Sequence, residues 1–475
     1  MRRLALHPLL IWSVFAAIHL WLGYVGLTAP TLPWGDVTAV YDTWVNNGFK
    51  GYWVGIDGPW VYPLLALVPM VAAMALGSGL YGTTWLLLVT LANGLVLAFI
   101  LYSRATTVAP DSAHAPSVGA GAGAPGAPRA MSTVAAPAAA APPTAAPPAA
   151  TPHVVAPAAV APDARPTGFA PNIRFVAAWW WLLFLLLLGP VALGRIDTFE
   201  VALVIVGLLL AIRRPAVAGV LLAAATWVKV WPIAMVVALM IAVKRRWTLA
   251  IAAAATAAVI AGVGLALGAG ANLVSFVTQQ TGRGLQIEAP VSTPWMWLAY
   301  LRLPGSVVYY DQDILTFQVK GNGAPIADVL TTPLLALAVL AVLLLGIWVV
   351  RTGASVTAVL PPLALALVTA LIVFNKVGSP QFMLWLTAPV ILGLIWQGRR
   401  FRLFAIITAV LGALTQIIYP YYYDWLISLD TFMLLTLTVR NVLVCVLFVL
   451  AVRALLRARV RAATPVAPLQ QKVVI

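Results

Sequence analysis

Long apolar segments are the feature that most constrains the fold of this chain. Of its 475 residues, 63% are hydrophobic and only 9% are charged. An apolar run of about 20 residues forms a helix long enough to cross a hydrocarbon core of about 30 Å. A soluble domain of this size needs far more polar surface, so the sequence predicts an all-α integral membrane protein.

Apolar patterning divides the chain into about twelve candidate spans. They are residues 9–29, 82–103, 174–193, 197–212, 215–228, 231–243, 247–268, 331–350, 354–374, 379–396, 401–419 and 431–452. Segments 215–228 and 231–243 are each too short to span alone, which leaves two interpretations open: a hairpin or one long tilted helix. Another apolar run, 61–77, is also short and is interrupted by Pro69.

The distribution of charge predicts the topology. Basic residues gather at the ends of the apolar runs, as they do in cytoplasmic loops. If both termini are cytoplasmic and residues 61–77 do not cross, eleven of the thirteen acids lie outside, and only Asp111 and Asp163 do not. We therefore interpret 61–77 as a juxtamembrane or re-entrant helix on the outer side. The net charge of +15 then reflects topology and not nucleic-acid binding.

The chain divides into four parts by composition. Residues 1–103 hold the first span, an outer loop with juxtamembrane helices, and the second span. Residues 104–172 form an Ala/Pro-rich linker whose prolines oppose a helix, and we expect it to be disordered and cytoplasmic. Residues 173–457 form the transmembrane core with an outer loop at 270–330, and 458–475 form a disordered tail. The single cysteine, Cys445, excludes an internal disulfide.

The first outer loop, residues 34–63, carries the chemistry. It holds Asp36, Asp42 and Asp57 in a chain that is poor in charge. Carboxylates can act as general bases, Arg and Lys can hold a phosphate, and aromatic rings can stack on sugars. Such a mixture suits glycosyl transfer from a phosphate-linked sugar. Because nucleotide sugars are cytosolic, an enzyme of the outer face needs a donor carried by a membrane lipid, and the sequence shows no Gly-rich phosphate loop.

Four patterns along residues 9–397 resemble one known family. They are WGDVTAVYDTW with GPWVYPLL, GRIDTFEVALVIVGLLLA with RPAVAGVLLAAATWVKVWP, RGLQIEAPVSTPW, and NKVGSPQFMLWL. In this order they resemble the polyprenol-phosphate-dependent mannosyltransferases of actinobacteria, glycosyltransferase family 87. The chain departs from the family at Leu64, where a second proline is common, and in its long linker.

The resemblance implies a GT-C helix bundle with about twelve transmembrane helices, and it implies roles for particular residues. Asp36 would be the catalytic base. The donor phosphate would be held by Lys229, Arg283, Lys376 and Arg195. The sugar or acceptor would be lined by Glu288, Gln286, Gln381, Asp197 and Tyr62. Structural alternatives exist, since Asp36 could cap a helix and Lys229 could be an interfacial lysine.

The resulting expectation is an enzyme of the extracytoplasmic face of the cell membrane. It would move a hexose, mannose by resemblance, with inversion, from a polyprenyl-phosphate donor to a glycolipid or cell-envelope glycan acceptor. No metal site is predicted, although a divalent cation is compatible with the chemistry. An arabinosyl- or glucosyltransferase is one alternative. A lipid-linked-sugar transporter or flippase is another, but it should carry charges inside several spans, whereas these spans are expected to be free of charge.

Overall fold

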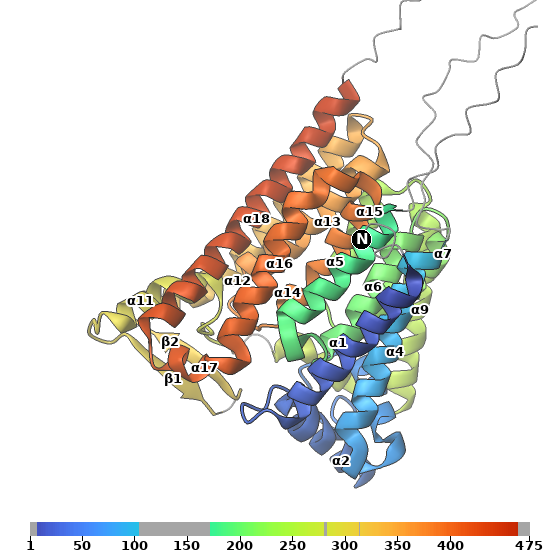
Figure 1. Cartoon of the computed structure of the whole chain (residues 1–475). Helices are drawn as coiled ribbons and strands as arrows, with labels where there is room; N and C mark the ends of the chain where they lie inside the picture. The colour runs from blue at the N-terminus through green and yellow to red at the C-terminus, as the bar shows by residue number, and fades with distance from the viewer. Residues whose placement is uncertain (1–6, 104–171, 280–282, 313, 464–475) are drawn as a thin grey trace, which may run out of the picture. The chain divides into compact units, whose positions relative to one another are not determined.

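The structure is a computed structural model that describes residues 7–103, 172–279, 283–312 and 314–463 (Figure 1). The described residues belong to one compact unit. Residues 104–171 and 464–475 lie outside the described residues, so the disorder expected for the linker and for most of the tail stays a prediction.

Almost all of the regular structure is helical, as the composition predicts. The elements are α1 (Pro8–Thr28), α2 (Asp42–Phe49), α3 (Leu67–Ala72), α4 (Tyr81–Tyr102), α5 (Asn172–Leu188), α6 (Asp197–Leu210), α7 (Pro215–Val228), α8 (Ile233–Ala242), α9 (Arg246–Ala266), α10 (Ser275–Thr278), α11 (Thr293–Tyr300), β1 (Val307–Asp311), β2 (Thr316–Lys320), α12 (Ala324–Arg351), α13 (Val356–Val373), α14 (Phe382–Trp385), α15 (Thr387–Gln397), α16 (Arg402–Gln416), α17 (Tyr423–Ile427) and α18 (Thr431–Ala463). Residues 458–463, which the sequence assigned to the tail, therefore continue α18 as helix.

Within the described residues, eight helical segments are long and apolar enough to cross a membrane. They are Pro8–Thr28, Ser78–Tyr102, Ile173–Ala192, Arg246–Ala266, Ala324–Arg351, Val356–Val373, Phe382–Tyr421 and Thr431–Arg459. This confirms the prediction of an all-α membrane protein. Helix α6 has 14 residues and is about 21 Å long, shorter than a hydrocarbon core of about 30 Å. The number of crossings therefore stays a prediction.

Residues 215–243 form two helices and not one long helix. Helix α7 ends at Val228, the backbone is extended at Lys229 with φ −153° and ψ 144°, and α8 begins at Ile233. The first turns of α9 return to the first turns of α7, where Gly219 leaves no room for a Cβ beside the Leu249 carbonyl oxygen. The segment is therefore a hairpin with Lys229 at its tip.

The short apolar run after the first outer loop forms a broken helical stretch, Leu64–Leu76. Its central part is α3, and the Tyr81 hydroxyl of α4 donates to the Met70 carbonyl at 3.0 Å. The stretch ends at Gly77, whose φ of +88° suits glycine. At about 1.5 Å per residue it is shorter than a membrane core, in line with the juxtamembrane interpretation.

The segment before α12 contains a β-hairpin that the all-α prediction lacked. Strands β1 and β2 pair antiparallel with Tyr309 opposite Gln318. Both strands are rich in β-branched and aromatic residues, which favour a pleated sheet. Residues 285–287 attach to its edge, because Ile287 N–H donates to the Phe317 carbonyl at 3.2 Å. In Figure 1 this hairpin lies with α11 and α17 at the N-terminal end of α18.

The helices differ in how much of their surface faces the bundle interior. Of the most apolar part of Val356–Val373, 72% is buried, against 17% for Ala324–Arg351. Helix α13 is thus central and α12 peripheral. Helix α6 is also interior, and its first residue, Asp197, is fully buried. The core therefore holds the N-terminus of α6 in a fixed place, and the candidate site is built around it.

Candidate functional site

Asp36 lies at the start of a short π-helical segment that follows the first long helix. Its carboxylate Oδ2 is 3.2 Å from Nε of Arg195, and the two side chains are 38% and 5% exposed. The carboxylate is therefore held on one side by a buried guanidinium and remains accessible on the other. An acceptor hydroxyl could reach it.

Arg195 is fixed from three directions. Its Nη1 donates to the carbonyls of Pro33 at 3.1 Å and Gly194 at 2.9 Å, and its Nη2 donates to the Tyr419 hydroxyl at 2.9 Å. Burial alone would lower the pKa of Arg195, but the neighbouring Asp36 and Tyr419 raise it, and the net shift is upward. The guanidinium is therefore a permanent cation beside Asp36.

Trp34 anchors the backbone just before Asp36. The indole is fully buried, and its Nε1 donates to the Pro190 carbonyl at 2.8 Å. The ring lies directly against Gly26 of α1 and against Gly194, with no room for a Cβ at either position. Packing of this kind ties the loop that carries Asp36 to the segment that carries Arg195.

Lys229, at the tip of the α7–α8 hairpin, forms an ion pair with Asp197. Its Nζ is 2.7 Å from both carboxylate oxygens, and Nε1 of Trp385 donates to Oδ1 at 2.7 Å. The ammonium also lies 5.4–5.8 Å from the ring centroids of Tyr62, Phe382 and Trp385. Burial is the largest influence and would lower the pKa of Lys229, but Asp197, Tyr62 and Glu200 together outweigh it, so the pKa rises. The lysine is therefore charged.

A second buried acid, Glu200, stands one turn further along α6. Its Oε1 accepts a hydrogen bond from Nε1 of Trp231 at 3.2 Å. The rings of Trp231 and Trp385 stack at a centroid distance of 5.2 Å with an interplanar angle of 16°. Two indoles thus hold the two acids of α6, one each. In the sequence, Trp231 stands out only as a neighbour of Lys229. Nothing in the sequence predicts that Trp385 stacks on Trp231.

Tyr62 and Arg283 extend the site from Lys229. Tyr62 is within electrostatic range of Lys229, Asp36 and Asp197, and burial is the main cause that raises the pKa of its phenol. Arg283 is in turn within electrostatic range of Tyr62, and burial lowers its pKa. Among the described residues its buried Nε has no hydrogen-bond partner, and no ion pair involves it. A buried cationic donor without a partner suits an incoming anion.

Glu288 is a buried carboxyl within electrostatic range of Arg195. It is 1% exposed, and it interacts with Arg195, Arg440 and the Tyr423 hydroxyl. Burial is the dominant influence and raises the pKa of Glu288 to about 7, although the two arginines and the hydrogen bond oppose it. A carboxyl with this pKa gains or loses its proton near neutral pH.

The raised pKa of Glu288 predicts a pH-dependent stability. Because the folded protein holds this proton more tightly than the unfolded chain does, the contribution of Glu288 to stability is greatest below about pH 4.5 and is lost as pH rises through about 7. The Glu288→Gln variant should lose this dependence. Thermal unfolding in detergent at about pH 5 and about pH 8 compares the two, with Asp57→Asn, an exposed acid outside this cluster, as control. An equal pH dependence in Glu288→Gln and the native chain would contradict the prediction.

Arg440 corrects one expectation about the spans. It lies within the predicted span 431–452, in α18, and is 1% exposed, so that span is not free of charge. Its guanidinium donates to the Glu288 carbonyl and, at 2.8 Å, to Asn441 Oδ1, while Asn441 Nδ2 donates to Thr293 Oγ1 at 2.8 Å. An arginine inside an apolar run is visible in the sequence and marks a candidate functional residue, but the predicted sites did not include it.

The remaining predicted residues join the segment 283–289 to the segment 374–382. Lys376 Nζ is 3.0 Å from Oδ1 of Asp328 on α12. Gln286 Oε1 accepts from the Gly378 N–H at 3.1 Å, and its own N–H donates to the Lys376 carbonyl at 3.0 Å. Gln381 is buried immediately before α14. These contacts hold residues 374–382 against residues 283–289, which carry Arg283 and Glu288.

The part of the chain that the structure describes contains no group of three or more His, Cys, Asp or Glu that could hold a metal ion. Comparison with protein-family models, with curated proteins and with solved structures found no match. The argument for function therefore depends on the residues themselves. Their arrangement brings an accessible carboxylate, three cations and several aromatic rings to the N-terminus of α6.

Proposed function

We propose that the chain is an integral membrane glycosyltransferase of the GT-C fold with about twelve spans. It transfers a hexose, mannose by the resemblance of its motifs, from a polyprenyl-phosphate donor to a lipid-linked or cell-envelope acceptor on the extracytoplasmic face. The observation that carries the proposal is the 38% exposed Asp36 side chain, held by buried Arg195 beside a cluster of further cations.

In the proposed reaction Asp36 accepts the proton of the acceptor hydroxyl. The hydroxyl oxygen attacks the anomeric carbon from the face opposite the phosphate, so the configuration inverts. The bond between the anomeric carbon and the phosphate oxygen breaks, and its electron pair stays on the phosphate. Cations near the leaving phosphate stabilise the negative charge that develops there.

The cations contribute differently in this proposal. Arg283 offers a buried Nε without a partner among the described residues, so it is the main phosphate ligand. Lys229 is already paired with Asp197 and supplies positive potential at the edge of the site. The guanidinium of Arg195 already donates to two backbone carbonyls and to the Tyr419 hydroxyl, and it pairs with Asp36. Its role is therefore to orient the Asp36 carboxylate.

A transporter of lipid-linked sugars is the second candidate, and Arg440 is the observation that favours it. A fully buried cation inside a membrane helix is costly and is often part of a transport path. Here, however, Arg440 donates to a backbone carbonyl and to its neighbour Asn441, which is a structural arrangement. We therefore favour the enzyme.

Proteoliposomes containing the full chain separate the two candidates. The donors are radiolabelled polyprenyl-phosphate mannose, glucose and arabinose, each offered with a membrane glycolipid extract. The enzyme is expected to form a labelled glycolipid from one donor, and Arg283→Gln is expected to raise the KM for that donor. The matched control is Arg302→Gln, an exposed arginine in the turn after α11. Movement of the intact donor across the bilayer with no glycolipid product would support a transporter and overturn the proposal.

A further inference from the structure

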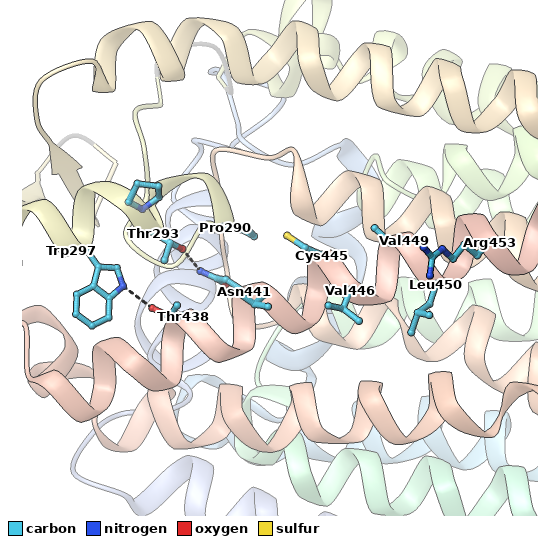
Figure 2. A pocket seen from close by; sticks show the side chains of 12 residues that line it. Pro290, Thr293, Trp297, Thr438, Asn441, Cys445, Val446, Val449, Leu450 and Arg453 are labelled. Atoms are coloured by element: carbon cyan, nitrogen blue, oxygen red, sulfur yellow. Dashed lines mark hydrogen bonds between the residues drawn. The ribbon is translucent and has the colours of Figure 1, made fainter.

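A groove of about 650 Å³ runs along α18 on the face that meets α11 (Figure 2). Its lining residues are Pro290, Thr293, Pro294, Trp297, Thr438, Asn441, Val442, Cys445, Val446, Val449, Leu450 and Arg453. The polar residues gather at one end and Arg453 lies at the other, with an apolar floor between them. From Asn441 to Arg453 the helix rises about 18 Å, close to the ~15 Å thickness of one leaflet's hydrocarbon.

The two ends of the groove differ in their unused hydrogen-bonding capacity. At the polar end, Trp297 Nε1 donates to Thr438 Oγ1 at 2.9 Å, and Asn441 Nδ2 donates to Thr293 Oγ1 at 2.8 Å. The Trp297 indole and the Asn441 amide therefore already donate to neighbouring side chains. At the other end Arg453 is exposed and takes part in none of the ion pairs among the described residues.

Arg457 adds a second cation at the Arg453 end. It is exposed, and it lies four residues further along α18, so both guanidinium groups share one face of the helix. None of the ion pairs among the described residues involves it either. Arg459 differs, because its guanidinium stacks over the Trp348 ring at 4.1 Å. The groove therefore ends at Arg453, with Arg457 one turn beyond it, and neither has an ion-pair partner among the described residues.

We propose that this groove binds one acyl chain of an anionic phospholipid, whose phosphate lies on Arg453 and Arg457. The groove lies within the candidate span Thr431–Arg459, so the surrounding bilayer supplies its occupant. Lipid chains are as apolar as leucine, so the groove walls determine the position of the chain but do not select the lipid. Selection comes from the headgroup, and each guanidinium near an anionic membrane surface contributes about a fivefold preference.

The test uses lipids with a spin label on the acyl chain. The full chain is reconstituted in phosphatidylcholine vesicles that contain spin-labelled phosphatidylglycerol or, separately, spin-labelled phosphatidylcholine. Paramagnetic resonance measures the motionally restricted fraction of each. The native chain is expected to restrict phosphatidylglycerol preferentially, and Arg453→Gln should reduce that preference about fivefold. Arg402→Gln is the matched control, an exposed arginine at the start of α16 that does not line the groove.

A groove-filling variant tests the position of the chain. Val446→Trp places an indole on the groove floor and is expected to release the restricted lipid, while Val446→Ala keeps it. An unchanged preference in Arg453→Gln, or an unchanged restricted fraction in Val446→Trp, would overturn the proposal. Displacement of the label by polyprenyl phosphate in Arg453→Gln as readily as in the native chain would also overturn it, because Arg453 would then not select the anionic headgroup. None of these spin-label measurements depends on sugar transfer.

Discussion

Asp36→Asn is expected to lower the rate of sugar transfer by about 10²–10⁴, the range typical for loss of a general base. Asparagine keeps the size of the side chain, and its amide oxygen can still accept from Nε of Arg195, which lies 3.2 Å from the native carboxylate. The change therefore removes the ability to take a proton while it preserves the packing. Initial rates of transfer from polyprenyl-phosphate mannose in proteoliposomes measure the effect.

Two further measurements make the Asp36 prediction specific. Donor binding to Asp36→Asn should remain, because the proposed phosphate ligand is Arg283. Asp42→Asn serves as the matched control, since Asp42 lies in the same loop and its carboxylate accepts only from Asn46 in the hydrogen bonds described, at 3.1 Å. Equal loss in both variants would point to a general effect on the loop. Native activity in Asp36→Asn would remove Asp36 from the mechanism.

The sequence was sufficient for the helices because their signal is local. Apolar length and composition predict a membrane helix without knowledge of its neighbours, and a helix is present within each of the twelve predicted segments. The ends are less well defined, as α12 begins at Ala324 and not at residue 331. The β-hairpin of β1 and β2 was missed because each strand has only five residues, too few for a clear periodic pattern.

The site was only partly predictable, for a different physical reason. Scarce charges in outer loops mark candidates, because an ionisable residue near a membrane is costly. Their partners depend on tertiary packing and have no local signature. Lys229 and Asp197 lie 32 residues apart, and Arg195 and Tyr419 lie 224 apart. The sequence therefore predicts Lys229 as a phosphate ligand, and only the structure shows that it is already paired with Asp197.

Lys229→Met is expected to cost about 3–5 kcal/mol of stability, because it leaves Asp197 as an uncompensated buried charge. Asp197 is fully buried, and after the change only Trp385 Nε1 still donates to it among the hydrogen bonds described. The double variant Lys229→Met/Asp197→Asn should regain most of this loss, since both charges are then gone and the indole can still donate to the amide oxygen. Unfolding by a denaturing detergent measures the stabilities, with Lys244→Met, an exposed lysine, as control.

The double variant also separates the two roles of Lys229. If the ammonium supplies potential to the donor phosphate, the stable double variant should bind the donor more weakly and transfer sugar more slowly. If the pair only joins the α7–α8 hairpin to α6, the double variant should work as well as the native chain. A single variant cannot make this distinction, because unfolding alone would abolish activity. Failure of Asp197→Asn to restore stability would show instead that the lysine is held by its aromatic neighbours, Tyr62, Phe382 and Trp385.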